Sequence, residues 1–248
     1  MSVEFDPCAA LAPLVDDGWL DTILYEVKSG KEATVFCCRG GSRSPVPLVA
    51  AKVYRPLESR RFKNDAMYIG GRVHMARAGR VKRAVEAKSS FGRSVQYGTW
   101  IAHEWEVMNV LHDAGASVPQ PLALAEQAIL MPFLGDESAA APPLHAVQLD
   151  PEAAGAVLDE LLWNIELMLD LDCVHGDLSP YNILLDGDRP VVIDFPQAID
   201  PRLNRNGHAL FCRDVENVCR WAEKHGVQRS AGRIAAELWQ RFVMGELG

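Results

Sequence analysis

The stretch that decides the fold is His175-Gly-Asp-Leu-Ser-Pro-Tyr-Asn182, which is followed further along the chain by Ile193-Asp-Phe195. A carboxylate at Asp177 can orient an attacking hydroxyl or water and accept its proton. Asn182 offers a neutral oxygen and Asp194 a second carboxylate, and hard divalent cations prefer such ligands. This spacing matches H-x-D-x-x-x-x-N followed by D-F, the template of phosphoryl transfer. We therefore predict that Asp177 and Asp194 are catalytic and that Asn182 and Asp194 bind the metal.

A lysine in an apolar strand is the next candidate. Lys52 lies within Leu48–Tyr54, whose composition predicts a β-strand. A buried lysine without an anion would lose its charge, so Lys52 needs an anion, which a phosphate and a helical glutamate would supply. The alternative is a lysine on an edge strand that faces water. The helix predicted over 100–114 supplies Glu104 and Glu106, which point to nearly opposite sides. Both border the apolar face of that helix, and the pattern alone leaves the partner open.

The turn Ser29-Gly-Lys-Glu32 separates two predicted strands, 22–27 and 33–38. A glycine there lets backbone N–H groups approach a phosphate, and Ser29 and Lys31 add donors. The turn matches neither of the two common glycine-rich phosphate motifs. Taken alone, it is therefore an ordinary hairpin turn.

Hydrophobic periodicity and breaker residues predict two lobes. The expected divisions are an N-terminal lead segment over 1–20, an N-lobe over 21–132, a hinge or connection over 133–150 and a helical C-lobe over 151–248. The predicted elements are a short helix in 6–20, an antiparallel meander over 22–27, 33–38 and 48–54, a strand pair over 122–125 and 127–131, short strands over 183–185 and 191–193, and helices from 151, over 208–224 and over 231–246.

Composition narrows the class of protein. The 248 residues are 48% hydrophobic and 23% charged, which excludes disorder throughout. No window approaches the roughly 18 uninterrupted apolar residues of a membrane helix, and the N-terminus shows no basic segment followed by an apolar run. We therefore expect a cytoplasmic chain with no membrane partner. None of the six cysteines forms a C-x-x-C pair, so we expect reduced thiols and no zinc site.

The net charge of −8 hides a basic segment. Residues 55–93 carry eleven Lys or Arg against three acidic residues, which makes this segment +8 and the remainder −16. We predict a flexible, partly helical insertion over 55–98, whose basic part, 55–93, can contact RNA or a ribosomal partner. A solvated flexible loop is the alternative, because charge runs without interleaved aromatic residues often stay disordered.

Further motifs carry a resemblance that spans nearly the whole chain. Ser29–Val35 is similar to S-T-G-K-E-A-x-V, Ala51–Tyr54 to A-x-K-[VI]-Y, and Glu106–Val110 to E-x-x-N-L. Ala141–Leu149 is similar to A-P-x-L-x-x-V-x-L. Together with the two stretches quoted first, these segments resemble the RIO family of atypical serine/threonine protein kinases, specifically its bacterial and archaeal first-branch members.

The resemblance implies a bilobal, protein-kinase-like α+β fold with a small antiparallel-sheet N-lobe and a reduced helical C-lobe without an activation loop. It implies that Lys52 holds the α- and β-phosphates, and it favours Glu106 over Glu104 as the partner of Lys52. Adenine would sit after Met131, against the Pro132 carbonyl and the Leu134 N–H. The implied nucleotide contacts are Ser29, Gly30, Lys31, Glu32, Val35, Lys52, Glu106, Met131, Pro132, Leu134 and Ser179.

The implied activity is transfer of the ATP γ-phosphoryl group with Mg²⁺, or with Mn²⁺, to an unknown protein or to the chain itself, or hydrolysis of ATP. Two alternatives stay open. Small-molecule phosphotransferases acting on aminoglycosides or choline share H-G-D-L-x-x-x-N and a terminal I-D-[WF]. An ATP-gated switch on RNA or a ribosomal precursor, with little kinase activity, would make use of the basic segment.

Overall fold

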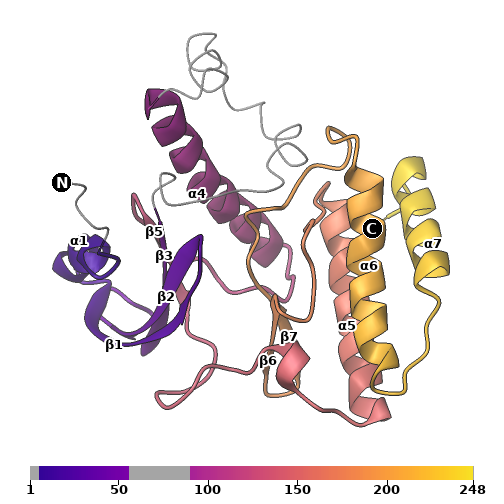
Figure 1. Cartoon of the computed structure of the whole chain (residues 1–248), viewed down its shortest axis with the longest axis horizontal. Coiled ribbons are helices and arrows are strands. Elements are labelled where there is room, and N and C mark those ends of the chain that lie inside the picture. Colours follow the sequence, from indigo (N-terminus) through magenta and orange to yellow (C-terminus); the bar gives the residue numbers. More distant parts are fainter. Residues whose placement is uncertain (1–5, 56–89, 248) are drawn as a thin grey trace. The chain divides into compact units, whose positions relative to one another are not determined.

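The computed structural model describes residues 6–55 and 90–247, with the backbone alone for 90–99. The chain divides into two compact units. Among the described residues, the sheet unit contains 6–55, 90–106 and 120–140, and the helical unit contains 107–119 and 141–247 (Figure 1). Residues 107–119, which we expected in the N-lobe, thus group with the helical unit.

The sheet unit is built on a five-stranded antiparallel sheet in the order β1-β2-β3-β5-β4. Short polar turns join its first three strands into the predicted meander, and the fourth and fifth strands form a short hairpin. Each strand lies within a few residues of its predicted range. The bounds are β1 Leu20–Ser29, β2 Ala33–Gly40, β3 Leu48–Tyr54, β4 Ala123–Leu124 and β5 Ala128–Pro132.

The helix predicted in 6–20 is short, consisting of η1 Ala9–Leu11 and α1 Ala12–Asp16. It ends because Gly18 takes a positive φ of 76°, and the N–H groups of Gly18 and Trp19 turn back to carbonyls of the last helical turn. The chain then enters β1. The helix buries leucines against one face of the sheet, in a cluster of Leu11, Leu14, Phe36, Val49, Ala51, Val53 and Leu130.

The long helix α4, Ser90–Asp113, begins ten residues before its predicted start. Its buried positions recur at a spacing of three or four residues, as one face of a helix requires: Ile101, Glu104, Met108 and Leu111. Ile101 packs with Tyr54 and Ile129, on the face of the sheet opposite to α1. The division between the two units falls within α4, after Glu106.

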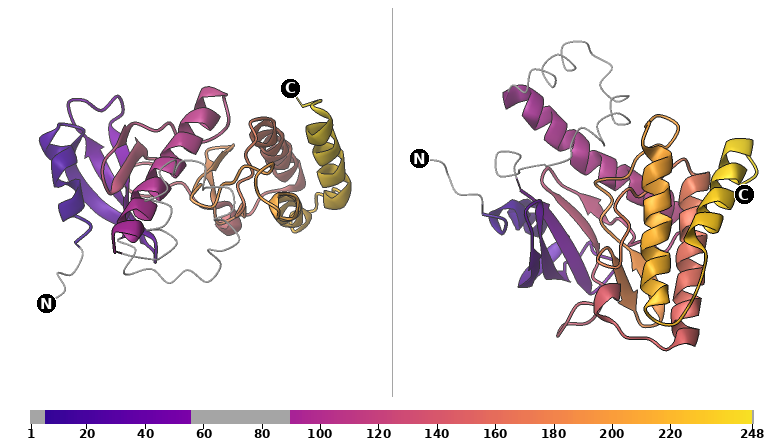
Figure 2. Two further views of the ribbon diagram at one scale, coloured as in Figure 1. Left: turned by 90° about the horizontal axis from the view of Figure 1, so that it is seen from above. Right: turned by 45° about the vertical axis from the view of Figure 1, so that its right-hand side comes forward.

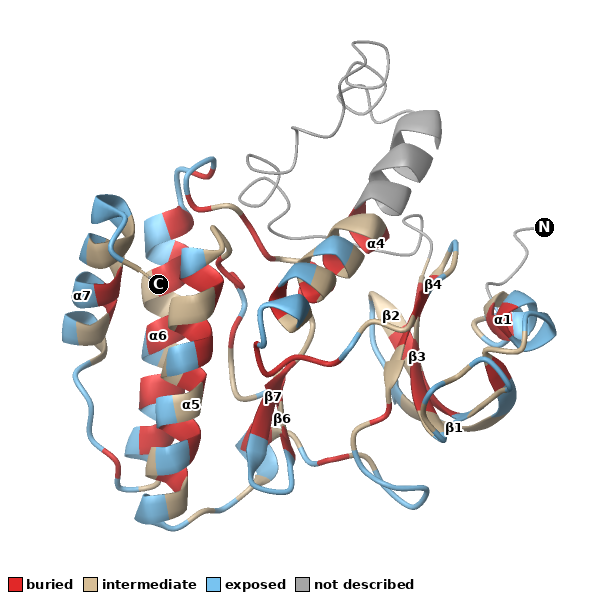
Figure 3. Cartoon of the chain, turned by 180° about the vertical axis from the view of Figure 1, so that it is seen from behind, coloured by how far each residue is buried: buried red, intermediate tan, exposed pale blue. Residues whose placement is uncertain are grey.

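The helical unit packs α5 Pro151–Asp170, α6 Gly207–Glu223 and α7 Ala231–Met244 side by side (Figures 1 and 2). Buried residues form stripes along α5 and α6 (Figure 3). The predicted start of α5 is confirmed: the Asp150 carboxylate accepts the Ala153 N–H at 2.9 Å as an N-cap. The remaining elements are η4 Leu144–Ala146 and the hairpin of β6 Ile183–Asp186 with β7 Arg189–Val192.

The predicted basic insertion over 55–98 lies almost wholly outside the described residues. Within the basic segment 55–93, Arg55 alone has a described side chain. Along the described parts of the chain, no helix is both long and apolar enough to cross a membrane.

Candidate active site

Lys52 forms a salt bridge with Glu104, with 2.6 Å between Nζ and Oε1. The expectation that Glu106 is the partner is therefore wrong. Glu104 lies in the buried stripe of α4 and is 1% exposed, whereas Glu106 is exposed. Two residues along a helix correspond to a rotation of about 200°, so only one of the two glutamates can face the sheet. The ion pair thus joins Glu104 on α4 to Lys52 on β3.

Next to Lys52, the same face of the sheet carries apolar side chains. Alternation along β3 places Ala50 on the same face as Lys52. Val35 lies opposite Lys52 on β2, and Met131 lies opposite Ala50 on β5, so their side chains share this face. Val35, Ala50 and Met131 belong to one hydrophobic cluster with Phe133. Two predicted nucleotide contacts, Val35 and Met131, thus form an apolar surface beside a cation, which suits a base next to phosphates.

The hairpin loop that joins β1 to β2 is fastened at its base by Arg55. The Gly30 N–H donates to the Ala33 carbonyl at 2.9 Å. The Arg55 guanidinium donates to Ser29 Oγ at 2.7 Å and to Thr34 Oγ1 at 3.2 Å. The backbone N–H of Arg55 donates to the Glu32 carbonyl at 2.8 Å. Sequence reasoning counted Arg55 only as part of the basic segment and missed this role.

The strand register bears on one of the two expected adenine contacts, Pro132. The Phe133 N–H donates to the Leu48 carbonyl at 3.0 Å, which makes that pair a hydrogen-bonded one. Hydrogen-bonded and non-hydrogen-bonded pairs alternate along an antiparallel ladder. The backbone groups of Pro132, which pairs with Val49, therefore turn away from β3. Leu134 lies beyond the end of β5, so the register does not orient its N–H, and both adenine contacts stay predictions.

In the helical unit, the motif residues gather around the loop before β6. The Asn182 amide donates to the Asp177 carbonyl at 2.9 Å and to Asp177 Oδ2 at 3.4 Å. The Ile193 N–H donates to the Asn182 carbonyl at 3.0 Å, which brings Asp194 next to this loop. The Ser179 carbonyl accepts the Asn182 N–H at 2.9 Å and closes the turn. The structure therefore brings Asp177, Asn182 and Asp194 together.

His175 connects the two halves of the motif. Its Nδ1 accepts the Asp177 N–H at 3.3 Å, so Nε2 carries the proton and donates to the Ile193 carbonyl at 3.2 Å. Its ring also lies 4.9 Å from that of Phe195, which is fully buried. Between Ile193 and Phe195, Asp194 takes a positive φ of 74°, a conformation that costs a non-glycine residue about 1–2 kcal/mol. The backbone hydrogen bonds of Ile193 and the burial of Phe195 hold the chain on both sides of Asp194 and offset that cost.

Asp214 on α6 holds the backbone of the loop that carries Asp177. Its carboxylate accepts the Gly176 N–H at 2.7 Å and the Leu178 N–H at 3.0 Å. The neighbouring Arg213 donates to the Gly176 carbonyl. Asp214 is 2% exposed, and burial raises its pKa to about 6. These contacts give Asp214 a structural role, and the sequence signal for it is an acidic residue within the apolar face of α6.

The electrostatics of Asp177 suit a general base. Partial withdrawal from water raises the pKa of its carboxyl, and the nearby Asp194 carboxylate adds to the rise, against the opposing charge of Arg213. A base whose pKa is closer to the operating pH removes a proton more effectively. The side chain nevertheless stays exposed, so a substrate can reach it.

The oxygen ligands near Asp177 fit a magnesium ion. The side-chain amide of Asn182 donates through its nitrogen, which leaves the side-chain oxygen Oδ1 for a cation. Asp194 adds a carboxylate. Mg²⁺ in phosphotransfer sites is held by one or two such groups, by substrate phosphates and by water. The donor set therefore suits a hard divalent cation that binds together with a nucleotide.

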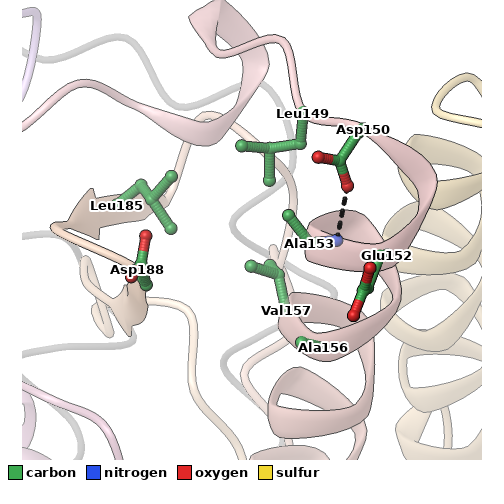
Figure 4. Close-up of a pocket in the computed structure, with 8 residues that line it drawn as sticks. All are labelled: Leu149, Asp150, Glu152, Ala153, Ala156, Val157, Leu185 and Asp188. Atoms are coloured by element: carbon green, nitrogen blue, oxygen red, sulfur yellow. Dashed lines mark hydrogen bonds between the residues drawn. The ribbon is translucent and has the colours of Figure 1, made fainter.

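A pocket of about 360 Å³ elsewhere in the helical unit contains none of the predicted site residues (Figure 4). It lies between the start of α5 and the β6–β7 turn, and its lining includes Asp150, Glu152 and Asp188. Three carboxylates repel the negative charge of a nucleoside triphosphate. The Asp150 carboxylate is also already engaged in capping α5. This pocket is therefore not a candidate for the nucleotide site.

Two features together define a protein-kinase-like phosphotransferase. One is a lysine–glutamate pair between a sheet and a helix, and the other is an H-x-D-x-x-x-x-N loop followed by an aspartate at a strand end. The model of the RIO domain matches residues 34–234. The chain belongs to the RIO family of ATP-dependent serine/threonine protein kinases, and its fold is the α+β, kinase-like fold of that family. This membership separates the chain from the small-molecule phosphotransferases that share the H-G-D-L pattern.

Three relatives illustrate the match. Over 241 residues, the chain is 28% identical to the RIO-type serine/threonine-protein kinase Rio1 of Haloferax volcanii, covering 97% of this chain and 75% of the relative. Over 204 residues, it is 31% identical to Rio1 of Methanocaldococcus jannaschii, covering 81% and 63%. Over 229 residues, it is 28% identical to serine/threonine-protein kinase RIO3 of Bos taurus, covering 88% and 42%. The chain thus spans from under half to three quarters of the length of these relatives.

Proposed function

We propose that Asp177, Asn182, Asp194 and Lys52 carry out transfer of the ATP γ-phosphoryl group to a serine or threonine hydroxyl. The observation that carries this proposal is the convergence of Asp177, Asn182 and Asp194 through the Ile193–Asn182 backbone hydrogen bond. Lys52, oriented by Glu104, would hold the α- and β-phosphates. The apolar face around Val35 and Met131 would receive adenine.

In this mechanism, Asp177 accepts the proton of the acceptor hydroxyl as its oxygen attacks the γ-phosphorus. The bond between the γ-phosphorus and the β–γ bridging oxygen breaks, and ADP leaves with the electron pair. Mg²⁺ held by Asn182 and Asp194 would neutralise phosphate charge when bound. Most of the rate enhancement comes from positioning and charge complementarity.

We further propose that the acceptor is a protein or the chain itself, and that water is the competing acceptor. The exposure of Asp177 supports either acceptor, because its carboxylate is open to a large substrate and to solvent. The basic segment 55–93 stays a predicted RNA or ribosome contact. An ATP-dependent reaction fits the cytoplasmic location that the sequence suggests.

The test uses purified chain, γ-labelled ATP, and Mg²⁺ or Mn²⁺. Phosphate release and label retained on protein are followed for wild type, Asp177→Asn and Asp194→Asn, with Asp188→Asn as the matched control. Acid-stable label that both site variants lose and the control keeps supports kinase activity. Phosphate release with only hydroxylamine-sensitive label indicates an ATPase whose intermediate is an acyl phosphate. Wild-type chain without any metal-dependent turnover would contradict the proposal.

A further inference from the structure

Tyr54 contacts both members of the lysine–glutamate pair. It ends β3 two residues after Lys52, so the two side chains lie on one face of the sheet. Tyr54 Oη lies 2.5 Å from Glu104 Oε2, while Lys52 Nζ lies 2.6 Å from Glu104 Oε1. The Lys52 ammonium is also 5.2 Å from the centroid of the Tyr54 ring, within the range of a cation–π interaction. Each of the three side chains therefore contacts the other two.

Burial makes the tyrosine hydroxyl important to Glu104. Tyr54 is 2% exposed and Glu104 is 1% exposed, beside the apolar side chains of Ile101 and Ile129. A buried carboxylate is costly unless donors satisfy its oxygens. Here Oε1 receives the ammonium and Oε2 receives the phenol, in a short charge-assisted hydrogen bond. Loss of the phenol would take one donor from a carboxylate in a largely apolar environment.

We propose that Tyr54 is a positioning residue for phosphotransfer. Its hydroxyl fixes the Glu104 carboxylate, and through that carboxylate it holds the Lys52 ammonium where the ATP phosphates bind. Tyr54 itself contacts no phosphate in this scheme. The inference rests on the proposed role of Lys52. It adds that β3 supplies both Lys52 and Tyr54, the residue that orients Glu104, the partner of Lys52.

A purely structural tyrosine would behave differently from a positioning one. Tyr54→Phe keeps the ring and its packing and removes only the hydroxyl. If the ring alone matters, this substitution leaves Lys52 unchanged. If the hydroxyl acts through Glu104, its removal loosens the ion pair, and the effect disappears once Glu104 can no longer pair with Lys52.

The first experiment measures the reactivity of the Lys52 amine without nucleotide. Wild type, Tyr54→Phe, Glu104→Gln and the double variant are treated with succinimidyl acetate from pH 7 to 10, and labelling of Lys52 is followed by peptide mass spectrometry. The exposed Lys28 and Lys224 serve as internal standards. We expect Tyr54→Phe to accelerate labelling of Lys52 by about 10-fold, the scale of one hydrogen bond to a charged group. In the Glu104→Gln background, the same change should alter the rate by less than about 2-fold.

The second experiment measures kcat and KM for ATP in the same variants. The matched control is Ser117→Ala, which removes another hydroxyl–carboxylate contact, from Ser117 Oγ to Glu160 at 2.7 Å, outside the proposed machinery. Tyr54→Phe should lower kcat/KM by about 10-fold, and Ser117→Ala should not change it. If Glu104→Gln fails to fold by circular dichroism, Glu104→Met, which also cannot pair with Lys52, replaces it in the cycle.

The two failures can be told apart. Wild-type rates of Lys52 labelling in Tyr54→Phe, or an equal acceleration with and without Glu104, would overturn the positioning role. A clear labelling cycle in a chain that never turns over Mg-ATP would instead uphold the role of Tyr54 toward Lys52 and contradict the proposed function.

Discussion

Asp177 combines accessibility with a perturbed proton affinity. Its carboxylate is exposed, yet its surroundings raise its pKa, while the Asn182 amide limits its orientations. The backbone below it is fixed by His175 and by Asp214. An exposed reactive group on a fixed backbone is what a base acting on a macromolecular acceptor requires.

We predict that Asp177→Asn lowers kcat by about 10²–10⁴-fold, because the amide cannot accept the hydroxyl proton. In the wild type, the carboxylate is the active form and its pKa is raised. Activity should therefore fall as the pH drops through a value above that of an ordinary aspartate. A profile of kcat/KM from pH 4 to 9 checks this. An unchanged kcat in the variant would remove Asp177 from the mechanism.

Motif spacing alone predicts Asp177, Asn182, Asp194 and Lys52 as site residues, and the structure brings the first three together. The catalytic and metal-binding roles of these residues stay predictions. The sequence led to the wrong glutamate, because Glu104 and Glu106 both flank the apolar stripe of α4 and only the register of packing distinguishes them. The contacts made by Tyr54 and Arg55 could not be predicted, since they depend on which side chains of different strands and helices meet.

At the scale of elements, the β1–β2 hairpin derives its geometry from the end of β3. The register pairs Ala33 with Tyr54, the last residue of β3, so the residue that follows the strand, Arg55, reaches the loop. Arg55 uses this place to bind both the Ser29 and Thr34 hydroxyls and the Glu32 carbonyl. A loop of few residues thus gains a fixed base while Gly30 and Lys31 stay exposed to a ligand.

We predict that Arg55→Gln raises KM for ATP several-fold with little change in kcat, because the loop loses about two hydrogen bonds at its base and orders less readily. Arg39→Gln is the matched control, since Arg39 on β2 makes only an exposed pair with Glu137 at 3.0 Å. Steady-state kinetics on both variants decides the matter. Equal KM values for Arg55→Gln and Arg39→Gln would refute the role of Arg55 in holding the base of the β1–β2 loop.

Most element positions were predictable from periodicity, and the failures have local causes. The N-terminal helix is short because Gly18 ends it and β1 then begins at Leu20. The predicted start of α4 at residue 100 is too late: glycine favours turns, and Gly92 and Gly98 precede that start, yet the helix runs through both positions. Glycine lowers helix propensity by only about 1 kcal/mol, which a long helix can tolerate.

At the scale of the whole molecule, a buried carboxylate links pH to stability. Burial raises the pKa of Asp214 from 3.8 to about 6, so the folded chain binds this proton more tightly than the unfolded chain does. The contribution of this group to stability is complete below about pH 4 and is lost as the pH rises through about 6. The loss is on the order of 2–3 kcal/mol.

The expected result is a difference in Tm between wild type and Asp214→Asn that changes with pH. Wild type should lose stability relative to the variant as the pH rises from 4 to 7, because only wild type must ionise a buried group. Thermal denaturation followed by circular dichroism at several pH values measures this. A constant difference, or one that grows in favour of wild type, would contradict the assignment.

The charge distribution of the whole chain supports one further prediction. If the basic segment 55–93 binds RNA, affinity should fall steeply with salt, and Lys82→Glu with Arg83→Glu should weaken binding to any RNA sequence. Filter binding at several salt concentrations tests this. Binding that ignores both salt and the charge reversal would favour a solvated loop.

Phe195 also bears on how inhibitors of this chain can be selective. It is fully buried against His175 and is followed by Pro196, whose ring restricts the backbone. A compound that needed Phe195 to leave its place would have to expose this ring, at a cost of about 1.5–3 kcal/mol, which is roughly 10–100-fold in affinity. Chemical libraries against this kinase should therefore favour compounds that occupy the apolar face around Val35 and Met131.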